Sequence, residues 1–227
     1  MLETNPSSSP RLYGRRKGRP LHKRKSALVE TLLPQLEIKW PTAGVLNPLS
    51  LFKFKPKEIW LEVGFGGGEH LTAQAARHPD IGFIGCEPFL NGIASLLEHI
   101  DQQHLTNIRV FPDDARKVLD ALPDASLSWS FVLYPDPWPK KRHAERRFIN
   151  AENMQRFARA FKSDAELRLA TDVAPLAAWM EERASAHPDF RQTYCGTQPP
   201  ADWIQTRYEQ KGLKAGRSPT YLCYRKR

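Results

Sequence analysis

The chain has 227 residues, and 34 Lys and Arg against 25 Asp and Glu give it a formal net charge of +9 at pH 7. This length is typical of one domain with a full core, and the positive balance favours a nucleic acid or an anionic membrane as partner. No apolar stretch reaches the ~20 residues of a membrane-spanning helix, and residues 1–10 lack the apolar core of a signal peptide. We therefore expect a soluble, cytoplasmic protein without a membrane partner.

The three cysteines indicate neither a disulfide framework nor a metal site. Cys86, Cys195 and Cys223 lack the spacing of metal ligands, and an odd number without a secretory signal favours reduced thiols. We expect these side chains to fill the core, and we expect no bound metal. The sequence gives no indication of an obligate protein partner.

Basic residues dominate the first 25 positions, where no acid follows Glu3. They are Arg11, Arg15, Arg16, Lys17, Arg19, Lys23, Arg24 and Lys25. Interspersed Gly and Pro break any amphipathic helix, so a transit peptide does not fit. We expect residues 1–25 to form a disordered basic arm that contacts phosphates, the alternative being a solvated tail. Residues 26–227 are expected to form a single domain.

Short apolar runs alternate with stretches of helical spacing from residue 58 onward. A brief helix and loop are expected before them, over residues 28–51. The predicted strands are 59–63, 81–86, 107–111, 127–133, a segment ending at 171, and a terminal pair, 190–195 and 220–224. Helices are expected between them, and the one after the fourth strand includes Met154, Phe157, Ala158 and Phe161. This alternation predicts an α/β fold with a doubly wound sheet and helices on both faces.

Acids stand at the end of each of the first five predicted strands, where ligands bind in such sheets. They are Glu62, Glu87, Asp113 with Asp114, Asp136, and Asp172. Because the carboxyl ends of parallel strands meet at one edge of a sheet, these residues mark a site.

A glycine loop follows the first strand with the spacing Glu62-x-Gly64-x-Gly66-x-Gly68. Such a loop brings backbone amides close to a ligand, although a tight turn between a strand and a helix is the alternative. Dinucleotide sites use the longer G-x-G-x-x-G spacing, and Glu62 would repel a pyrophosphate. The loop instead suits a ligand with an ammonium group beside a carboxylate, such as S-adenosylmethionine.

The next two strand ends fit the adenosine part of that ligand. Glu87 is placed to bind the ribose hydroxyls, the alternative being an exposed carboxylate at a strand end. Asp114 is placed to accept a hydrogen bond from the adenine amino group, and Asp113 competes for this role. Together with Gly64 and Glu62, these residues predict a pocket for the methyl donor.

Residues 133–147 read LYPDPWPKKRHAERR, directly after the fourth strand. The prolines at 135, 137 and 139 exclude a helix and an interior strand, so the segment is expected to be a stiff loop. It holds Asp136 beside Trp138 and leads into a basic run. We interpret it as an active-site wall next to a polyanion-binding surface. Trp138 is expected either to stack on a base or to pack into the core.

Four segments resemble the bacterial tRNA (guanine-N(7)-)-methyltransferase family: 61–66, 134–143, Thr171-Asp172 and 206–209. The resemblance extends from about residue 58 to the C-terminus. It implies a Rossmann-like, mostly parallel seven-stranded sheet with an antiparallel terminal strand. It also implies that the chain methylates N7 of guanine at position 46 of tRNA, with S-adenosylmethionine as the donor.

The resemblance also implies roles for individual residues. The donor-binding acids of the family correspond to Glu62, Glu87, Asp114 and Asp136. Its substrate-binding residues correspond to Lys140, Asp172, Thr206, Arg207, Tyr208 and Glu209, and its RNA-interacting residues to Arg142, His143, Arg146 and Arg147. Ala144 and Glu145 interrupt a run that is often wholly basic in the family, which leaves the contacts of Arg146 and Arg147 open.

The predicted chemistry needs no general base, because guanine N7 has a free lone pair and no proton. Asp136, with Asp172, is expected to position the guanine and to offset the positive charge that develops on it. One alternative is methylation of an exocyclic amine of DNA or RNA, which would need a small polar residue and two prolines before the aromatic residue, whereas Asp136-Pro137-Trp138 has one proline. The others are a non-catalytic tRNA-binding protein, which would not need the strand-end acids, and a nicotinamide oxidoreductase, which the glycine spacing disfavours.

Overall fold

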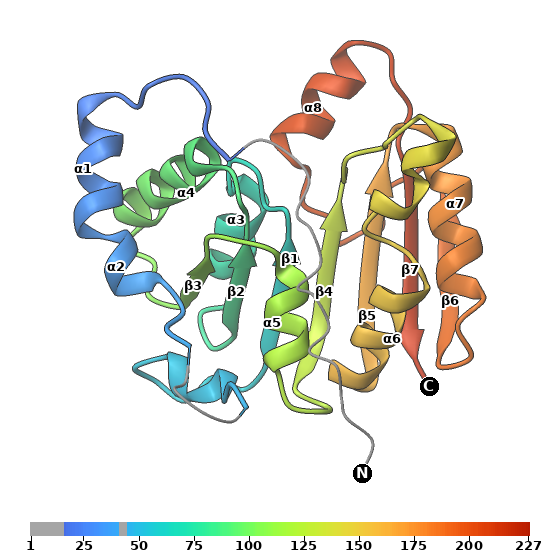
Figure 1. The fold of residues 1–227 in the computed structure, drawn as a ribbon, viewed down its shortest axis with the longest axis horizontal. Coiled ribbons are helices and arrows are strands. Elements are labelled where there is room, and N and C mark those ends of the chain that lie inside the picture. The colour runs from blue at the N-terminus through green and yellow to red at the C-terminus, as the bar shows by residue number, and fades with distance from the viewer. Residues whose placement is uncertain (1–15, 41–44) are drawn as a thin grey trace.

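The computed structural model describes residues 16–40 and 45–227, and these contain a seven-stranded sheet (Figure 1). The strands are β1 (Ile59–Val63), β2 (Gly82–Cys86), β3 (Ile108–Phe111), β4 (Leu127–Leu133), β5 (Phe161–Thr171), β6 (Phe190–Gly196) and β7 (Thr220–Lys226). Their order is β3-β2-β1-β4-β5-β7-β6. β1 to β5 pair in parallel, whereas β7 is antiparallel to both of its neighbours. The predicted doubly wound sheet with an antiparallel terminal strand is confirmed.

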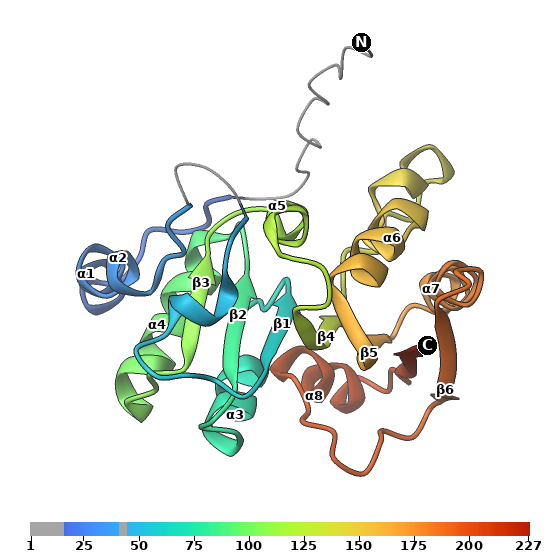
Figure 2. The ribbon, with the colours of Figure 1, turned by 90° about the horizontal axis from the view of Figure 1, so that it is seen from below.

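Helices cover both faces of this sheet (Figure 2). They are α1 (Lys23–Thr31), α2 (Leu33–Leu36), α3 (Glu69–Arg77), α4 (Leu90–Gln103), α5 (Ala115–Ala121), α6 (Ala151–Ala160), α7 (Ala174–Ser185) and α8 (Arg207–Lys214), with short 3₁₀ helices η1 (Pro48–Leu51) and η2 (Lys141–Arg146). α5, α6 and α7 pack on one face, and α2, α3 and α4 on the other. The chain order reverses between β1 and β4, which is where a doubly wound sheet opens a crevice for ligands.

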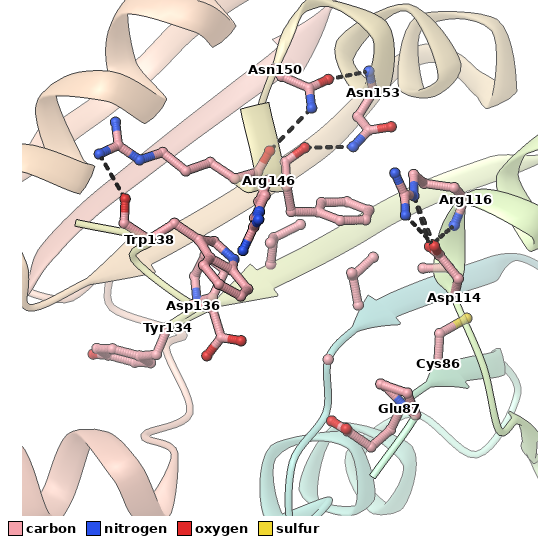
Figure 3. Close-up of a pocket in the computed structure, with 18 of the residues that line it drawn as sticks. Cys86, Glu87, Asp114, Arg116, Tyr134, Asp136, Trp138, Arg146, Asn150 and Asn153 are labelled. Atoms are coloured by element: carbon pink, nitrogen blue, oxygen red, sulfur yellow. Dashed lines mark hydrogen bonds and ion pairs between the residues drawn. The ribbon is translucent and has the colours of Figure 1, made fainter. Parts of the chain in front are cut away.

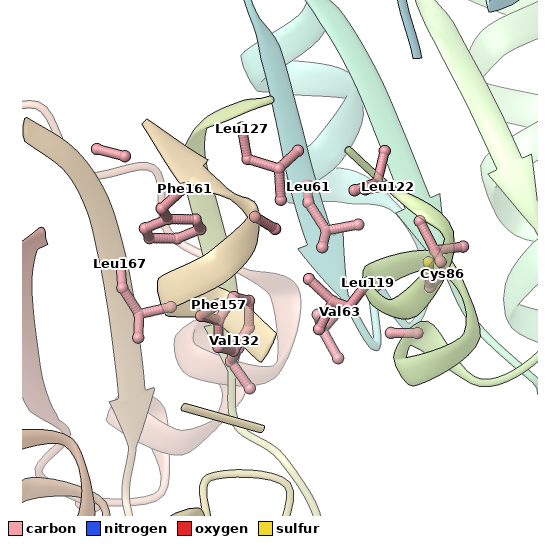
Figure 4. Close-up of a cluster of buried hydrophobic side chains, with 14 of the residues drawn as sticks. Leu61, Val63, Cys86, Leu119, Leu122, Leu127, Val132, Phe157, Phe161 and Leu167 are labelled. Atoms are coloured by element: carbon pink, nitrogen blue, oxygen red, sulfur yellow. The ribbon is translucent and has the colours of Figure 1, made fainter. Parts of the chain in front are cut away.

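Side chains alternate between two apolar layers along each central strand. In β1, Leu61 and Val63 pack with α5 and α6 (Figure 4). Trp60 belongs to the opposite layer, with α3 and α4. All five residues of β1 are buried, as expected for a parallel strand covered on both faces. Glu62 lies on the α3 side between these apolar positions, so its burial needs a polar partner.

The helix predicted after β4 is shorter than the sequence pattern indicates, because Phe161 is the first residue of β5 and not the last turn of α6. Its backbone is extended, with φ −79° and ψ 139°. The ring nevertheless packs against Phe157, with 5.4 Å between ring centroids (Figure 4). The i, i+4 apolar spacing therefore reflects a shared contact in the core across the junction of helix and strand.

The predicted basic arm lies partly outside the described residues, which begin at position 16. Residues 1–25 were expected to be disordered, but the described part of this segment is structured, because α1 begins at Lys23. The backbone N–H of Gly18 donates to Asn91 Oδ1 (2.8 Å), and Asn91 Nδ2 donates to the carbonyl of Arg19 (2.8 Å). These hydrogen bonds hold the segment against the start of α4, beside the carboxyl edge of the sheet.

Two of the cysteines fit the prediction of core positions and the third does not. Cys86 and Cys223 are buried, whereas Cys195 is exposed on β6, because β6 is an edge strand with one face open to solvent. Among the described helices, none is long and apolar enough to cross a membrane.

Candidate active site

Two adjoining cavities lie at the carboxyl edge of the sheet. The first, of about 350 Å³, extends from the ends of β2 and β3 to the loop after β4. The second, of about 430 Å³, lies between the glycine loop and the start of α8. Gly64, Gly66 and Tyr134 line both, so these residues form the boundary between the two.

The glycine loop joins the ends of β1 and β2. Gly66 has φ +57°, a conformation that only glycine adopts without strain, and its N–H donates to Glu87 Oε2 (2.9 Å). The other oxygen of Glu87 accepts from the N–H of Phe89 (3.0 Å). Burial raises the pKa of Glu87; these hydrogen bonds oppose the shift, and the charges of Asp136 and Glu62 add to it. Glu87 is therefore a rigidly held carboxylate on the wall of the first cavity (Figure 3).

Glu62 is held by a histidine on α3. His70 Nδ1 lies 2.7 Å from Glu62 Oε2, and both side chains are at most 4% exposed. The Nε2 of Gln74 lies 3.2 Å from the other ring nitrogen of His70. Because the amide nitrogen only donates, that ring nitrogen accepts, and the Nδ1–H donates to the carboxylate. One oxygen of Glu62 is thus fixed, and the residue lines the second cavity.

Asp113 and Asp114 both line the first cavity, and each is paired with cations. Asp114 caps α5 by accepting from the N–H of Arg116 (3.0 Å), and it also accepts from the Arg116 guanidinium. Asp113 lies further out, next to Lys117 and Arg16. Partial burial acts to raise the pKa of Asp113, but the hydrogen bonds from Lys117 and from the Asp114 backbone, with the charges of Lys117 and Arg16, together outweigh it, so the pKa is lowered.

The loop after β4 carries two strained residues on either side of Asp136. Tyr134 has φ +53° and Trp138 has φ +41°, values that are rare for large side chains and concentrate at functional sites. The N–H of Tyr134 donates to the carbonyl of Ala170 (2.7 Å) and fixes the start of the loop on β5. The Asp136 carboxylate points toward Glu87 across the first cavity (Figure 3).

Arg147 fixes the other end of this loop. Its Nε donates to the carbonyl of Pro137 (3.1 Å) and its Nη2 to that of Trp138 (3.3 Å). Its guanidinium also lies 4.7 Å from the ring centroid of Trp179 on α7. Arg147, assigned to the RNA surface by resemblance, therefore points into the protein in this structure.

Trp138 belongs to neither apolar core layer. The guanidinium of Arg146 lies 5.0 Å from its ring centroid, and both residues line the first cavity. Of the two alternatives, packing in the core is wrong, and stacking on a base stays a prediction.

The basic run from Lys140 to Arg142 faces solvent. Lys140 immediately precedes η2, and none of these three side chains lines either cavity. Partial burial and the charges of Arg146, Arg142 and Lys140 lower the pKa of His143 below its ordinary value of 6.5, which favours the neutral imidazole at neutral pH. The exposed cations lie directly beside the mouth of the first cavity.

A capping box begins α8 at the second cavity. Thr206 accepts from the N–H of Glu209 (3.0 Å), and Glu209 accepts from the N–H of Thr206 (3.4 Å). Glu209 is 1% exposed and also accepts from Tyr221 (2.6 Å) and Trp203 (3.0 Å). The structure thus places Glu209 in the interior, whereas Thr206, Arg207 and Tyr208 line the second cavity.

Asp172 lies beneath α8 and lines neither cavity. Its side chain is 3% exposed, and its Oδ2 lies 2.9 Å from Arg217 Nη1. The hydroxyl of Tyr208 lies 3.4 Å from the other oxygen, and the Tyr208 ring packs on Tyr134 with 5.1 Å between centroids. Asp172 therefore anchors the segment that closes the second cavity (Figure 1 shows α8 beyond the edge of the sheet).

Comparison with known proteins identifies relatives over most of the chain. The profile of a family described as "Putative methyltransferase" matches residues 56–222. A tRNA (guanine-N(7)-)-methyltransferase from Rhodospirillum rubrum is 48% identical, covering 100% of this chain and 91% of its own length. One from Paramagnetospirillum magneticum is 49% identical over 96% of this chain and 93% of its own length.

The chain belongs to the tRNA (guanine-N(7)-)-methyltransferase family. Solved structures show the same fold at low identity. The 16S rRNA methyltransferase KamB superposes with a TM-score of 0.56 at 14% identity, covering 75% of this chain and 88% of its own. TrmN from Thermus thermophilus gives 0.56 at 14% identity over 89% of this chain and 48% of its own. The fold is therefore that of Rossmann-like methyltransferases.

The structure brings together most of the residues to which the family resemblance assigns a ligand. Those that line the two cavities are Glu62, Gly64, Glu87, Asp114, Asp136, Arg146, Arg147, Thr206, Arg207 and Tyr208. Those outside both are Lys140, Arg142, His143, Asp172 and Glu209. Lys140 and Arg142 are exposed beside the site, while Asp172 and Glu209 support α8 from within.

Sequence reasoning missed His70 and Arg217, which partner Glu62 and Asp172. The sequence does contain a signal for His70. His70 and Gln74 are four residues apart, so both lie on the inner face of the helix that follows the buried acid Glu62. Arg217 has none, since only the tertiary fold brings it to Asp172.

Proposed function

We propose that this protein transfers a methyl group from S-adenosylmethionine to N7 of guanine at position 46 of tRNA. The observation that carries the proposal is the Asp136 carboxylate, held in a strained, proline-flanked loop, which faces the buried Glu87 across the first cavity (Figure 3). The names of the two relatives given above describe methylation of N7 of guanine in tRNA, and this supports the proposed substrate.

The residues of the first cavity fit the adenosine part of the donor. Glu87 is buried and already accepts one backbone N–H on each oxygen, and its remaining lone pairs are available to the two ribose hydroxyls. Asp114 lies at the far end of the cavity as the acceptor for the adenine amino group. The glycine loop with Gly64 and Gly66 allows the backbone to approach closely, because neither position carries a side chain.

The donor supplies an electrophilic methyl group on a sulfonium. Guanine N7 attacks with its own lone pair, so the carbon–nitrogen bond forms as the carbon–sulfur bond breaks, and the positive charge moves onto the purine. Asp136 offsets this charge and accepts hydrogen bonds from the N1 and N2 groups, which orients N7 in line. No proton has to leave N7, so Asp136 acts as a positioning and charge-stabilising group.

The exposed cations beside the cavity are proposed to hold the RNA backbone. Lys140, Lys141 and Arg142 face solvent next to Trp138, and residues 1–25 carry further cations. Contacts of this kind position the RNA without reading its sequence, and they weaken as salt increases. Arg146 lies against Trp138, where it places the indole at the mouth of the cavity for a base to stack on.

Incubation with donor labelled in the methyl group and unmodified tRNA, followed by nucleoside analysis, tests the proposal. We expect the label in N7-methylguanosine. Label in another nucleoside, or none with a donor that binds, would contradict the proposed activity.

A further inference from the structure

Tyr134 connects the loop that carries Asp136 with α8. It lies two residues before Asp136, and its ring extends away from Glu87 (Figure 3). The ring packs on Tyr208 of α8, with 5.1 Å between ring centroids. Tyr134 lines both cavities, and Tyr208 lines the second. A ligand in the second cavity can therefore touch α8 and the Asp136 loop at the same time.

The hydroxyl of Tyr134 is buried without a completed hydrogen bond. Among the described residues, no group has hydrogen-bond geometry with its oxygen. Glu209 and Tyr221 lie next to it, and burial together with the charge of Glu209 raises the pKa of Tyr134. The hydroxyl therefore keeps its proton and can donate. A buried donor without an acceptor is rare, because nothing offsets the loss of its hydrogen bonds to water.

The Glu209 carboxylate can accept a further hydrogen bond. Its Oε2 accepts from Trp203 Nε1 (3.0 Å) and from the N–H of Thr206 (3.4 Å). Its Oε1 accepts from the Tyr221 hydroxyl (2.6 Å). An ionised carboxylate has about four acceptor positions, so the described partners leave capacity on Oε1. An incompletely bonded donor on the Asp136 loop thus lies next to an acceptor on α8.

The structure favours α8 as the part that moves to complete this bond. Of its eight residues, Glu209 and Gly212 are buried and the others are not. An element with so little buried surface shifts at a low cost in free energy. The Asp136 loop is stiffer, because Pro135 fixes the backbone directly after Tyr134. The same stiffness means that whatever holds Tyr134 also holds Asp136.

We propose that Tyr134 is a positioning residue whose hydroxyl donates to Glu209 when the substrates bind, and that this hydrogen bond locks α8 onto the Asp136 loop. A ligand in the second cavity draws the two sides together, and the lock then holds Asp136 in place for the reaction. This inference rests on the proposed function for the identity of the substrates. It gives the hydroxyl of Tyr134 a role in which it touches neither the donor nor the RNA.

Tyr134→Phe removes the hydroxyl and keeps the ring, and its stability without substrates is the first test. Because this structure gives the hydroxyl no completed hydrogen bond, the melting temperature of the variant alone should equal that of wild type or exceed it. Tyr221→Phe is the matched control. Its hydroxyl already donates to Glu209, so its loss should lower the melting temperature by about 2–4 °C.

The locked state itself is tested with substrates present. Saturating S-adenosylhomocysteine and tRNA should slow hydrogen exchange at residues 207–214 about 10-fold in wild type and less than about threefold in Tyr134→Phe. In the variant, kcat should fall about 10-fold, the effect of one hydrogen bond to a charged group. KM for tRNA should stay within about twofold, because the phosphate contacts remain.

Three results would each overturn the inference: a lower melting temperature of Tyr134→Phe alone, a wild-type kcat in this variant, or wild-type slowing of its exchange by the two ligands. The exchange measurement needs bound ligands and no methyl transfer, so it does not depend on activity. Failure of the proposed function appears separately, as wild-type protein that binds both ligands and forms no N7-methylguanosine from donor and tRNA.

Discussion

At the scale of single residues, the site is built from carboxylates whose neighbours determine their roles. Glu62 is oriented by His70, Glu87 by two backbone amides, and Asp136 by a loop with strained residues on either side. Only Asp136 among these three is exposed, which suits a group that must reach a base entering from solvent.

Asp136→Asn keeps the size of the side chain and removes its charge. If the carboxylate offsets charge on the methylated guanine, kcat should fall by about 10²-fold, the usual cost of losing one preorganised electrostatic group. Affinity for tRNA, measured by filter binding, should change by less than about twofold because the phosphate contacts remain. A wild-type kcat would contradict this role.

Arg147 and Arg142 are both basic residues of one run, yet their surroundings predict opposite defects. Arg147→Ala removes two hydrogen bonds to the loop carbonyls, so kcat should fall about 10- to 100-fold with little change in tRNA affinity. Arg147→Lys keeps the charge without the planar fork and should behave similarly. Arg142→Ala should weaken tRNA binding and leave kcat at saturating tRNA unchanged. If Arg147→Ala instead weakened tRNA binding as Arg142→Ala does, Arg147 would be an RNA contact.

The raised pKa of Glu87 predicts that donor binding depends on pH. In the proposed function the ionised carboxylate accepts hydrogen bonds from the ribose on both oxygens, and protonation would remove part of that capacity. Burial raises this pKa above its ordinary value of 4.5, so donor affinity should be constant near neutrality and fall as the pH is lowered through the raised pKa. Titration calorimetry on wild type and Glu87→Gln isolates the effect. The variant should bind more weakly with less pH dependence, and an identical pH profile would contradict the assignment.

At the scale of elements, the sequence predicts the strands well because each central strand is a short apolar run between turn residues. It also predicts where Glu62, Glu87, Asp114 and Asp136 gather, since parallel strands share one carboxyl edge. It fails for Asp172 and Glu209. Both are acids near the site in the sequence, but a salt bridge from Arg217 and a capping box turn them toward α8, and such long-range partners leave no local pattern.

Arg217→Ala should loosen α8. The substitution leaves the buried Asp172 carboxylate without its cation, at a cost on the order of 1–3 kcal/mol. Hydrogen exchange at residues 207–214, followed by mass spectrometry, should become faster than in wild type, while exchange in β4 stays the same. Lys214→Ala is the control on the same segment and should not change the exchange. Unchanged exchange in Arg217→Ala would show that the ion pair does not hold the helix.

At the scale of the whole molecule, the charge of +9 is distributed around the site as well as along the N-terminal segment. Arg16 and Gly18 contact residues at the wall of the first cavity and the start of α4, while residues 1–15 add Arg11 and Arg15. Among the described residues, Arg16 and the run at Lys140–Arg142 flank the first cavity. The arrangement fits an RNA backbone that passes over it.

Removal of residues 1–15 should make tRNA binding less sensitive to salt. The slope of log K against log salt is negative, and each phosphate that the protein no longer neutralises reduces its magnitude by about 0.7 to 0.9. Removal of Arg11 and Arg15 should therefore reduce the magnitude by up to about 1.8. The fold should be retained, because the hydrogen bonds of Gly18 and Arg19 with Asn91 remain. Binding curves at several salt concentrations measure the slope, and an equal slope would mean that these residues make no phosphate contacts.

The proposed activity modifies one atom at one position of tRNA, so a pair of transcripts that differ only at position 46 tests it. Each is incubated with labelled donor, and the methylated position is found by cleavage at N7-methylguanosine. We predict cleavage at position 46 of the guanine transcript and none in the transcript with adenine there. Equal labelling of both transcripts, or methylation at another position of the first, would contradict the claim.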